Sequence, residues 1–187
     1  MIHDRVFLTG GARSGKSAMA ERLLADAAAV TYVATGPRPE TADPEWEQRI
    51  AAHRTRRPDH WTTLETTDLP PVIHAASPQH PVLVDCLTLW VTAHLDRLDA
   101  WTTDDPTSAQ QGLDAEIDAV VAAVRACSGG LVVVSNEVGS GIVPADAGTR
   151  RFRDWLGIAN ARVAAVCDRS YLVAAGRAVR LEAVGTI

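Results

Sequence analysis

A glycine-rich segment near the N-terminus carries the clearest chemical signal in the chain. It reads Gly10-Gly11-Ala12-Arg13-Ser14-Gly15-Lys16-Ser17 and matches the Walker A pattern G-x-x-x-x-G-K-[S/T] at every fixed position. Lys16 is the only lysine among the 18 basic residues of the chain. A flexible point charge fits between phosphate oxygens, where a planar guanidinium fits poorly. The segment therefore predicts a nucleoside triphosphate site and makes phosphoryl or nucleotidyl transfer the first hypothesis.

Magnesium is the metal that such a site uses, and the sequence offers ligands for it. The backbone amides of the glycine-rich segment would surround the phosphates, Lys16 would contact the β- and γ-phosphates, and Ser17 would bind Mg²⁺. The apolar run 82–84 ends in Asp85, a carboxylate that can hold Mg²⁺ directly or through water. Two alternatives stay open: in one, Asp85 caps the following helix instead, and in the other, Glu137, after the apolar run 131–134, holds the metal.

His53 is the histidine that stands among arginines. On a helix that Pro58 ends, Arg49, His53 and Arg57 are spaced by four residues and share one face, with Arg54 and Arg56 beside them. Arginines bind polyphosphates, and positive neighbours favour the neutral imidazole, which is the nucleophilic form. His53 is then either a nucleophile toward phosphorus or part of an anion-binding basic face. The pattern alone does not separate these two interpretations.

The elements that must position these residues alternate along the chain. Short β-rich apolar runs alternate with amphipathic stretches, which predicts an α/β fold with a mostly parallel sheet and helices on both faces. Ligands gather at the carboxyl ends of the strands in such sheets, where the glycine-rich segment, residues 35–36, 85–86 and 135–137, and Gly176 fall. The expected strands are 6–8, 30–34, 82–84, 131–134, 171–175 and 179–181, the last two joined by a turn at Gly176-Arg177. The expected helices are 17–28, 44–56, 88–98, 108–127 and 147–167.

Length and composition restrict the class of protein. The 187 residues predict one catalytic domain over 1–187. A net charge of −5 argues against nucleic-acid binding, and no apolar run is long enough for a membrane span. The N-terminus shows no signal peptide, and three widely spaced cysteines, Cys86, Cys127 and Cys167, suggest buried thiols in a reducing cytoplasm. We expect a cytoplasmic enzyme.

Further segments, together with the glycine-rich one, carry a resemblance that spans nearly the whole chain. The chain resembles the bifunctional adenosylcobinamide kinase / adenosylcobinamide-phosphate guanylyltransferase family of cobalamin biosynthesis. The most specific part is the stretch beginning Asn136-Glu137-Val138-Gly139 in combination with the Walker A segment. The matching segments, in order, are 9–17, 32–35, 49–50 with His53, 57–58, 61–65, 85–88, 136–144, and 152–154 with Gly157 and Asn160.

The resemblance implies a RecA-like P-loop fold, usually a homotrimer, with two activities. The kinase moves a γ-phosphate from ATP or GTP to the hydroxyl of adenosylcobinamide. The transferase then passes GMP from GTP, through a histidine–GMP intermediate, to adenosylcobinamide phosphate. By position that histidine is His53, and the implied nucleotide contacts are Thr35, Arg54, Arg57, Glu65 and Leu87. Separately from the resemblance, we interpret Glu137 as an acid–base group, a second metal contact or a substrate contact. The preference for guanine comes from the family alone.

A P-loop is also compatible with three functions other than the bifunctional enzyme. The first is a small-molecule kinase with no covalent step, in which replacing His53 leaves product formation unchanged. The second is a regulatory nucleotide-binding module, which would hydrolyse slowly, transfer to no acceptor and need a partner protein. The third, a RecA-like motor on DNA, is disfavoured by the short length and acidic charge of the chain.

Overall fold

Seven strands form one sheet in the computed structural model, which describes residues 3–36 and 57–185. The strand order is β3-β2-β4-β5-β1-β6-β7. All neighbouring strands are parallel except the last pair, in which β7 runs antiparallel to β6. This confirms the predicted α/β class with a mostly parallel sheet. The strands are β1 (Arg5–Thr9), β2 (Thr31–Ala34), β3 (Thr62–Glu65), β4 (Val82–Asp85), β5 (Leu131–Val134), β6 (Arg169–Ala174) and β7 (Arg177–Leu181).

The central strands are buried on both faces because nearly every side chain along them is apolar. In β5 all four residues are buried, and alternate side chains enter two different cores. Leu131 and Val133 pack on one face, whereas Val132 and Val134 pack on the other. Continuous apolar runs of three or four residues therefore mark β1, β4 and β5, the three strands in the middle of the sheet.

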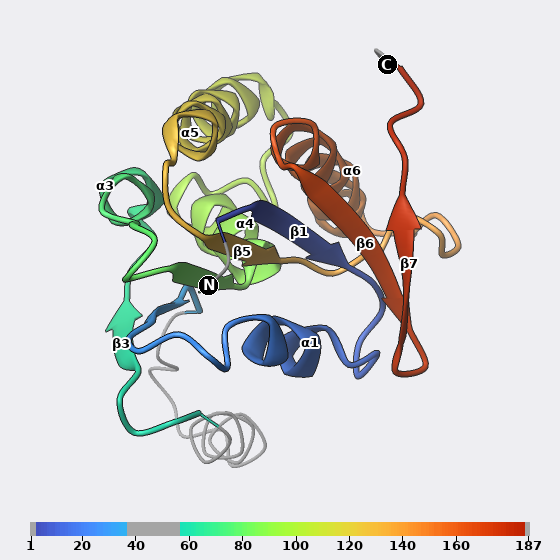
Figure 1. The fold of residues 1–187 in the computed structure, drawn as a ribbon. Coiled ribbons are helices and arrows are strands. Elements are labelled where there is room, and N and C mark those ends of the chain that lie inside the picture. Colours follow the sequence, from blue (N-terminus) through green and yellow to red (C-terminus); the bar gives the residue numbers. More distant parts are fainter. Residues whose placement is uncertain (1–2, 37–56, 186–187) are drawn as a thin grey trace.

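The helices cover the two faces unequally. Figure 1 shows α3, α4, α5 and α6 on one face and α1 on the other. The core on the first face includes Trp90, Leu113, Ile117 and Trp155, while the core under α1 is smaller and includes Leu24. The helices are α1 (Lys16–Leu23), α3 (Leu69–His74), α4 (Leu87–Arg97), α5 (Thr107–Ala126) and α6 (Ala147–Ala164).

Two predicted helices are too long at their C-terminal ends. The first was expected over 17–28 but ends at Leu23, where the amides of Leu24 and Ala25 bond three residues back and tighten the last turn. The last was expected over 147–167 but ends at Ala164, and the amides of Val166 and Cys167 show the same i−3 bonding. Each tightened turn directs the chain back toward the sheet.

Two elements were missed in the sequence. The strand β3 consists of four exposed residues at the edge of the sheet, so it lacks the apolar pattern that identifies a buried strand. The helix α3 has only six residues and contains two prolines, which normally argue against a helix. They are tolerated because they occupy the first turn, where a helix has no use for their missing amide hydrogens.

The C-terminal hairpin is present, but its turn lies one residue earlier than predicted. Ala174 pairs with Arg177, so Ala175 and Gly176 form the two-residue turn, in place of Gly176-Arg177. Both turn residues have positive φ, 49° and 73°, as a type I′ turn requires. Because the twist of this turn matches that of the strands, even an alanine is held in the left-handed region.

The predicted helix over 44–56, with Arg49, His53, Arg54 and Arg56, lies outside the described residues. Within residues 3–36 and 57–185, no helix combines the length and apolar character needed to cross a membrane.

Candidate nucleotide-binding site

The glycine-rich segment forms the loop between β1 and α1, as the sequence predicts. Gly10 has φ of 151°, and a Cβ atom there would lie 2.1 Å from the carbonyl oxygen of Val173 on β6. Gly15, with φ of 103°, is the N-cap of α1. Both positions therefore require glycine, the first for close backbone approach and the second for its left-handed conformation. Together they hold the loop at the N-terminus of a helix.

Lys16 is the buried cation of this loop. Its side chain is 6% exposed, and its ammonium group donates to the carbonyl oxygens of Gly10, 2.8 Å away, and Gly11, 2.7 Å away. The hydroxyl of Ser14 lies 3.4 Å from the same nitrogen. Burial lowers the pKa of Lys16, and the neighbouring Cys86 and Asp85 partly oppose that change. The ammonium is thus held at the centre of the loop by neutral oxygen atoms.

The tip of the loop is open to solvent, whereas the buried Ser14 attaches the loop to the hairpin. Gly11, Ala12 and Arg13 are exposed, and Arg13 has φ of 56°. The amide of Gly176 donates to the carbonyl of Ser14 at 2.9 Å, which joins the hairpin turn to the loop. The predicted position of Gly176 beside the glycine-rich segment is therefore confirmed.

Asp85 lies at the carboxyl end of β4 and accepts a hydrogen bond of 3.0 Å from the hydroxyl of Tyr32 on β2. Burial raises the pKa of Tyr32, helped by the nearby carboxylate, so the phenol keeps its proton and remains a donor. The guanidinium of Arg57 lies 3.8 Å from the centre of the Tyr32 ring, a cation–π geometry. Cys86 is the N-cap of α4, so the helix-capping alternative for Asp85 is wrong.

Sequence reasoning assigned Tyr32 no role of its own. It stood only in the family-like segment 32–35, and its hydroxyl reaches Asp85 because β2 and β4 are neighbours in the sheet. Strand order is a property of the tertiary structure. A tyrosine in a short strand expected to be buried was the available signal, since a buried tyrosine hydroxyl needs a partner.

Two of the predicted nucleotide contacts have buried side chains. Thr35 is 1% exposed, and its hydroxyl donates to the carbonyl of Cys86 at 2.6 Å and accepts from the Cys86 amide at 3.1 Å. Leu87, the first residue of α4, is fully buried. These two side chains join β2, β4 and α4 together. Any contact that they make with a nucleotide must come from their backbone atoms.

Two other predicted contacts lie farther along the same end of the sheet. Arg57 donates to the hydroxyl of Thr63 at 2.8 Å, and Glu65 is the exposed last residue of β3. His53 and Arg54 lie outside the described residues, so the structure does not show how they are placed relative to the loop.

Glu137 lies in the loop after β5, beside the glycine-rich loop. Its amide donates to the carbonyl of Gly10 at 3.0 Å. Its carboxylate accepts from the amides of Gly139 at 2.7 Å and Ser140 at 3.3 Å. The side chain thus organises the turn that follows it, while its backbone links β5 to the phosphate loop.

A second polar group at this end joins residues that had no role in the sequence beyond the family-like segments. The Thr88 hydroxyl accepts from the Asn136 amide at 2.8 Å, and the Asn160 side chain donates to the Asn136 carbonyl at 3.0 Å. These bonds join α4 and α6 to the loop after β5. The carbonyl oxygen of the Asn160 side chain is buried without a hydrogen-bond partner. Such long-range bonds have no spacing signature in a sequence.

The residues predicted to bind Mg²⁺ have suitable chemistry. Ser17 is half-buried in the first turn of α1, and Asp85 ends β4, which β5 separates from β1, so a hydroxyl and a carboxylate oxygen are supplied from two rigid elements. Mg²⁺ prefers such oxygen ligands and normally keeps several waters and substrate phosphate oxygens. Within the described part of the chain, no three His, Cys, Asp or Glu residues form a metal cluster. The residues therefore fit a magnesium ion bound together with a nucleotide.

The fold and the loop define the class of protein as a P-loop nucleotide-binding protein with a RecA-like sheet. Solved structures agree with this fold. The chain is similar to EscN, the assembled ATPase of the type III secretion system of enteropathogenic E. coli, with a TM-score of 0.53, 10% identity, 92% of this chain covered and 43% of that chain. It is also similar to a prototypical type III secretion ATPase, with a TM-score of 0.52, 13% identity and coverage of 91% and 51%. The chain thus spans about half the length of these ATPases.

The particular family follows from sequence comparison. The model of the cobinamide kinase / cobinamide phosphate guanyltransferase family matches residues 6–181. The bifunctional adenosylcobalamin biosynthesis protein CobU of Escherichia coli K12 is 40% identical over 184 residues, which cover 95% of this chain and 99% of that protein. CobP of Pseudomonas aeruginosa is also 40% identical, over 95% of this chain and 97% of that protein. The chain belongs to this family, which confirms the resemblance found in the sequence.

Proposed function

We propose that the protein catalyses two successive transfers in cobalamin biosynthesis. It first phosphorylates adenosylcobinamide with ATP or GTP, and it then transfers GMP from GTP to the product, giving adenosylcobinamide-GDP. The observation that carries this proposal is the phosphate loop around the buried Lys16, in a chain of the cobinamide kinase / cobinamide phosphate guanyltransferase family. The family supplies the acceptor, and the loop supplies the means of binding the donor.

In the phosphoryl transfer, the hydroxyl of adenosylcobinamide attacks the γ-phosphorus and the bond to the β-phosphate oxygen breaks. The hydroxyl loses its proton, and the nucleoside diphosphate leaves. The backbone amides of residues 10–15 and the Lys16 ammonium neutralise charge on the phosphates, which is electrostatic stabilisation by groups already in place. Lys16 must exchange its bonds to the Gly10 and Gly11 carbonyls for bonds to phosphate oxygens.

Ser17 and Asp85 would hold the magnesium ion that accompanies the nucleotide. When bound, Mg²⁺ offsets the negative charge of the phosphate oxygens. The part played by the protein is to orient the ligands: α1 fixes Ser17, and the Tyr32 hydroxyl fixes the rotamer of Asp85 through its 3.0 Å bond.

In the guanylyl transfer, His53 would attack the α-phosphorus of GTP, pyrophosphate would leave, and GMP would then pass to adenosylcobinamide phosphate. Splitting one displacement into two is what nucleophilic catalysis provides. Arg54, Arg57 and Glu65 would contact the nucleotide through their side chains. Thr35 and Leu87 would contact it through their backbone atoms, since their side chains are buried.

Glu137 is best assigned to support of the loop around the acceptor. Its carboxylate is bonded to two amides of its own turn, which is an arrangement that shapes residues 137–140. We therefore propose that the segment 136–144 contacts the corrinoid, with Glu137 fixing its conformation. An acid–base role would use the lone pairs of the carboxylate that these two bonds leave free.

The quaternary structure that we propose is a homotrimer in the cytoplasm. Exposed large apolar side chains on β7 and on the loop after β5 support a subunit interface; these are Val179, Leu181, Ile142 and Val143. Light scattering coupled to gel filtration should give three times the chain mass of 20.0 kDa. A monomer at micromolar concentration would exclude the trimer.

The test of the covalent step is intact mass spectrometry after incubation with Mg²⁺ and GTP. Wild-type protein should gain the mass of one GMP, lost on mild acid treatment, and a His53→Asn variant should gain nothing. If wild type shows no adduct while it still phosphorylates adenosylcobinamide, the enzyme is a small-molecule kinase and His53 is an anion-binding residue.

A further inference from the structure

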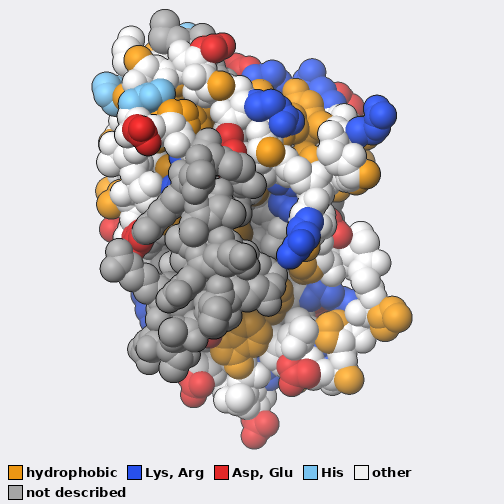
Figure 2. All heavy atoms as spheres, turned by 90° about the horizontal axis from the view of Figure 1, so that it is seen from below, with side chains coloured by type: hydrophobic (Ala, Val, Ile, Leu, Met, Phe, Trp, Pro, Cys, Tyr) orange, Lys and Arg blue, Asp and Glu red, His pale blue; other side chains and the backbone are white. Residues whose placement is uncertain are grey.

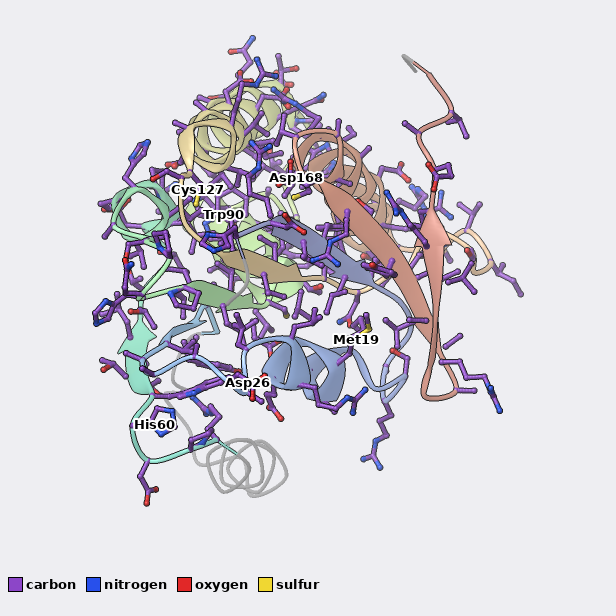
Figure 3. The ribbon with its side chains drawn as sticks, viewed as in Figure 1. Met19, Asp26, His60, Trp90, Cys127 and Asp168 are labelled. Atoms are coloured by element: carbon purple, nitrogen blue, oxygen red, sulfur yellow. The ribbon has the colours of Figure 1, made fainter. Side chains whose placement is uncertain are left out.

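A cavity of about 340 Å³ lies between α1 and the β6–β7 hairpin, on the side of the phosphate loop away from Asp85. Gly15 and Met19 line it from the loop and α1, and Val173, Gly176 and Ala178 line it from the hairpin. Figure 3 shows Met19 on the side of α1 that faces these strands. Gly15 belongs to both the phosphate loop and the cavity wall, so the cavity is directly next to the site expected for the phosphates. Its volume is at the lower end of the range for small-molecule sites, about 300–1,000 Å³.

The walls of this cavity combine apolar surface with two guanidinium groups. Met19 and Leu23 from α1 face Val173 and Ala178 from the hairpin, which gives an apolar slot that suits the face of a heterocyclic base. Arg22 and Arg177 stand on the two walls and are exposed. A guanidinium can stack on a base or donate to phosphate and ribose oxygens.

Among the described residues these two arginines, like Arg13, Arg125, Arg150 and Arg151, differ from six others that are paired. Arg5, Arg97, Arg153, Arg162, Arg169 and Arg180 each form an ion pair with a carboxylate. Within residues 3–36 and 57–185, neither Arg22 nor Arg177 forms one. Figure 2 views the molecule from the α1 side and shows basic side chains on the described part of this face. Both charges are therefore available to a ligand.

The strand order gives the direction of a bound triphosphate. Asp85 ends β4, which lies on one side of β1, whereas β6 and β7 lie on the other side. For γ-phosphate transfer, the terminal phosphate must lie near Lys16 and the metal ligand Asp85. The phosphate chain then runs over the N-terminus of α1 with its nucleoside end toward the hairpin. The cavity is the recess that meets it there.

We propose that this cavity binds the base and ribose of the ATP or GTP that donates its γ-phosphate in the kinase reaction. The inference rests on the proposed function and adds the nucleoside subsite of the kinase step. The hairpin can form one wall of this nucleoside subsite, because the bond from the Gly176 amide to the Ser14 carbonyl fixes the distance between the hairpin and the phosphate loop. Arg177 and Arg22 then set donor affinity, and the apolar slot accepts either purine.

Steady-state kinetics of adenosylcobinamide phosphorylation test the subsite. Arg177→Ala and Ala178→Trp should each raise the KM for ATP and for GTP about tenfold, since they remove a stacking or charged contact or fill the slot. Inhibition by inorganic tripolyphosphate, which has the phosphates but no nucleoside, should be unchanged. Arg180→Ala is the matched control on the same strand, because Arg180 pairs with Glu182 and does not line the cavity.

Unchanged KM values in both variants would overturn the subsite, as would a parallel loss of tripolyphosphate inhibition. Thermal unfolding of each variant guards against misfolding, and Arg177→Ala, at an exposed position, should keep the wild-type Tm.

A labelling experiment separates this inference from the proposed function, because it needs no turnover. Wild-type protein is irradiated with 8-azido-ATP and Mg²⁺, and the labelled peptides are identified. Label within residues 19–23 or 173–178 supports the subsite, whereas label confined to other peptides, or no label, contradicts it. If the label is found there but wild type phosphorylates no cobinamide, the proposed function fails while the nucleoside site stands.

Discussion

Charged side chains at the two ends of the parallel sheet have different bonding partners, as two pairs at one end and two residues at the other show. At the amino end, where β1 and β6 begin, opposite charges pair: Arg5 with Asp168 at 2.6 Å and Arg169 with Asp4 at 2.7 Å. At the carboxyl end, Lys16 is bonded to backbone carbonyls. Glu137 there is bonded to backbone amides. Figure 3 shows Asp168 at the start of β6, remote from Met19 beside the phosphate loop.

We interpret the paired charges at the amino end as contributing to stability and the charges at the carboxyl end as contributing to function. An ion pair neutralises both partners, so the amino end holds strands together and offers little to a ligand. Neutral hydrogen-bond partners satisfy a charged group without cancelling its charge, so Lys16 keeps its attraction for phosphate. The causes of the pKa shifts also differ between the two ends. At the amino end a charged partner, Arg5, holds the pKa of Asp168 at about 2, whereas at the carboxyl end burial lowers the pKa of Lys16. Substitutions at the two ends should therefore affect different measurements.

The largest effect is expected for Lys16→Ala, which should lower kcat/KM for adenosylcobinamide phosphorylation about a hundredfold to a thousandfold, because a charge that stabilises the transition state is lost. Lys16→Arg should recover little of this rate, since the planar group does not fit the loop. Both variants should still fold. Near wild-type activity in Lys16→Arg would show that charge alone, without the geometry of the loop, is what the carboxyl end provides.

A second, smaller effect concerns the architecture of the loop. Gly10→Ala should lower the free energy of unfolding by about 2–3 kcal/mol, because its Cβ would meet the Val173 carbonyl at 2.1 Å and its φ is 151°. Gly11→Ala is the matched control, since nothing lies within 4 Å of a Cβ there. Chemical denaturation measures both. Equal stability of the two variants would mean that the loop can move away from β6.

The hydroxyl of Tyr32 gives a third test, at the metal-binding side of the carboxyl end. Tyr32→Phe removes the hydrogen bond that orients Asp85, worth about 1 kcal/mol, so kcat should fall about fivefold and the Mg²⁺ concentration for half-maximal rate should rise. Tyr171→Phe, the other tyrosine of the chain, is the control. A Mg²⁺ dependence equal to wild type in Tyr32→Phe would place Asp85 outside the metal site.

The smallest effect is expected at the amino end. Asp168→Asn should lower the free energy of unfolding at pH 7 by at most about 1 kcal/mol, because the pair with Arg5 is partly exposed. The pKa of Asp168 is depressed from 3.8 to about 2, so its stabilising contribution is complete above pH 3.8 and disappears as the pH falls toward 2. Denaturation curves of variant and wild type should therefore converge at low pH.

Activity provides the second readout for Asp168→Asn. The kinase rate at 25 °C should match wild type, as should that of the exposed control Glu182→Gln. A loss of activity without a loss of stability would show that the amino end also takes part in function, and the division between the two ends would then fail.

Much of the carboxyl end could be predicted because local chemistry determines it. The phosphate loop needs two glycines, a lysine and a hydroxyl at set spacing, so residues 10–17 were identified without a structure. The apolar run ending in Asp85 was likewise visible, because a buried strand that stops at a carboxylate has a local pattern. The edge strand β3 was missed because exposure on both faces removes that pattern.

The sequence by itself determined the chemical class, the family and the succession along the chain of the buried strands and the longer described helices, because these depend on residue types, short spacings and the alternation of apolar runs. The tertiary structure decided which residues far apart in the chain meet: Tyr32 with Asp85, Gly176 with Ser14, and Arg5 with Asp168. Each of these contacts depends on which strands are neighbours. Neighbours are selected by the packing of both faces of the sheet as a whole, a global property with no local signature in the sequence.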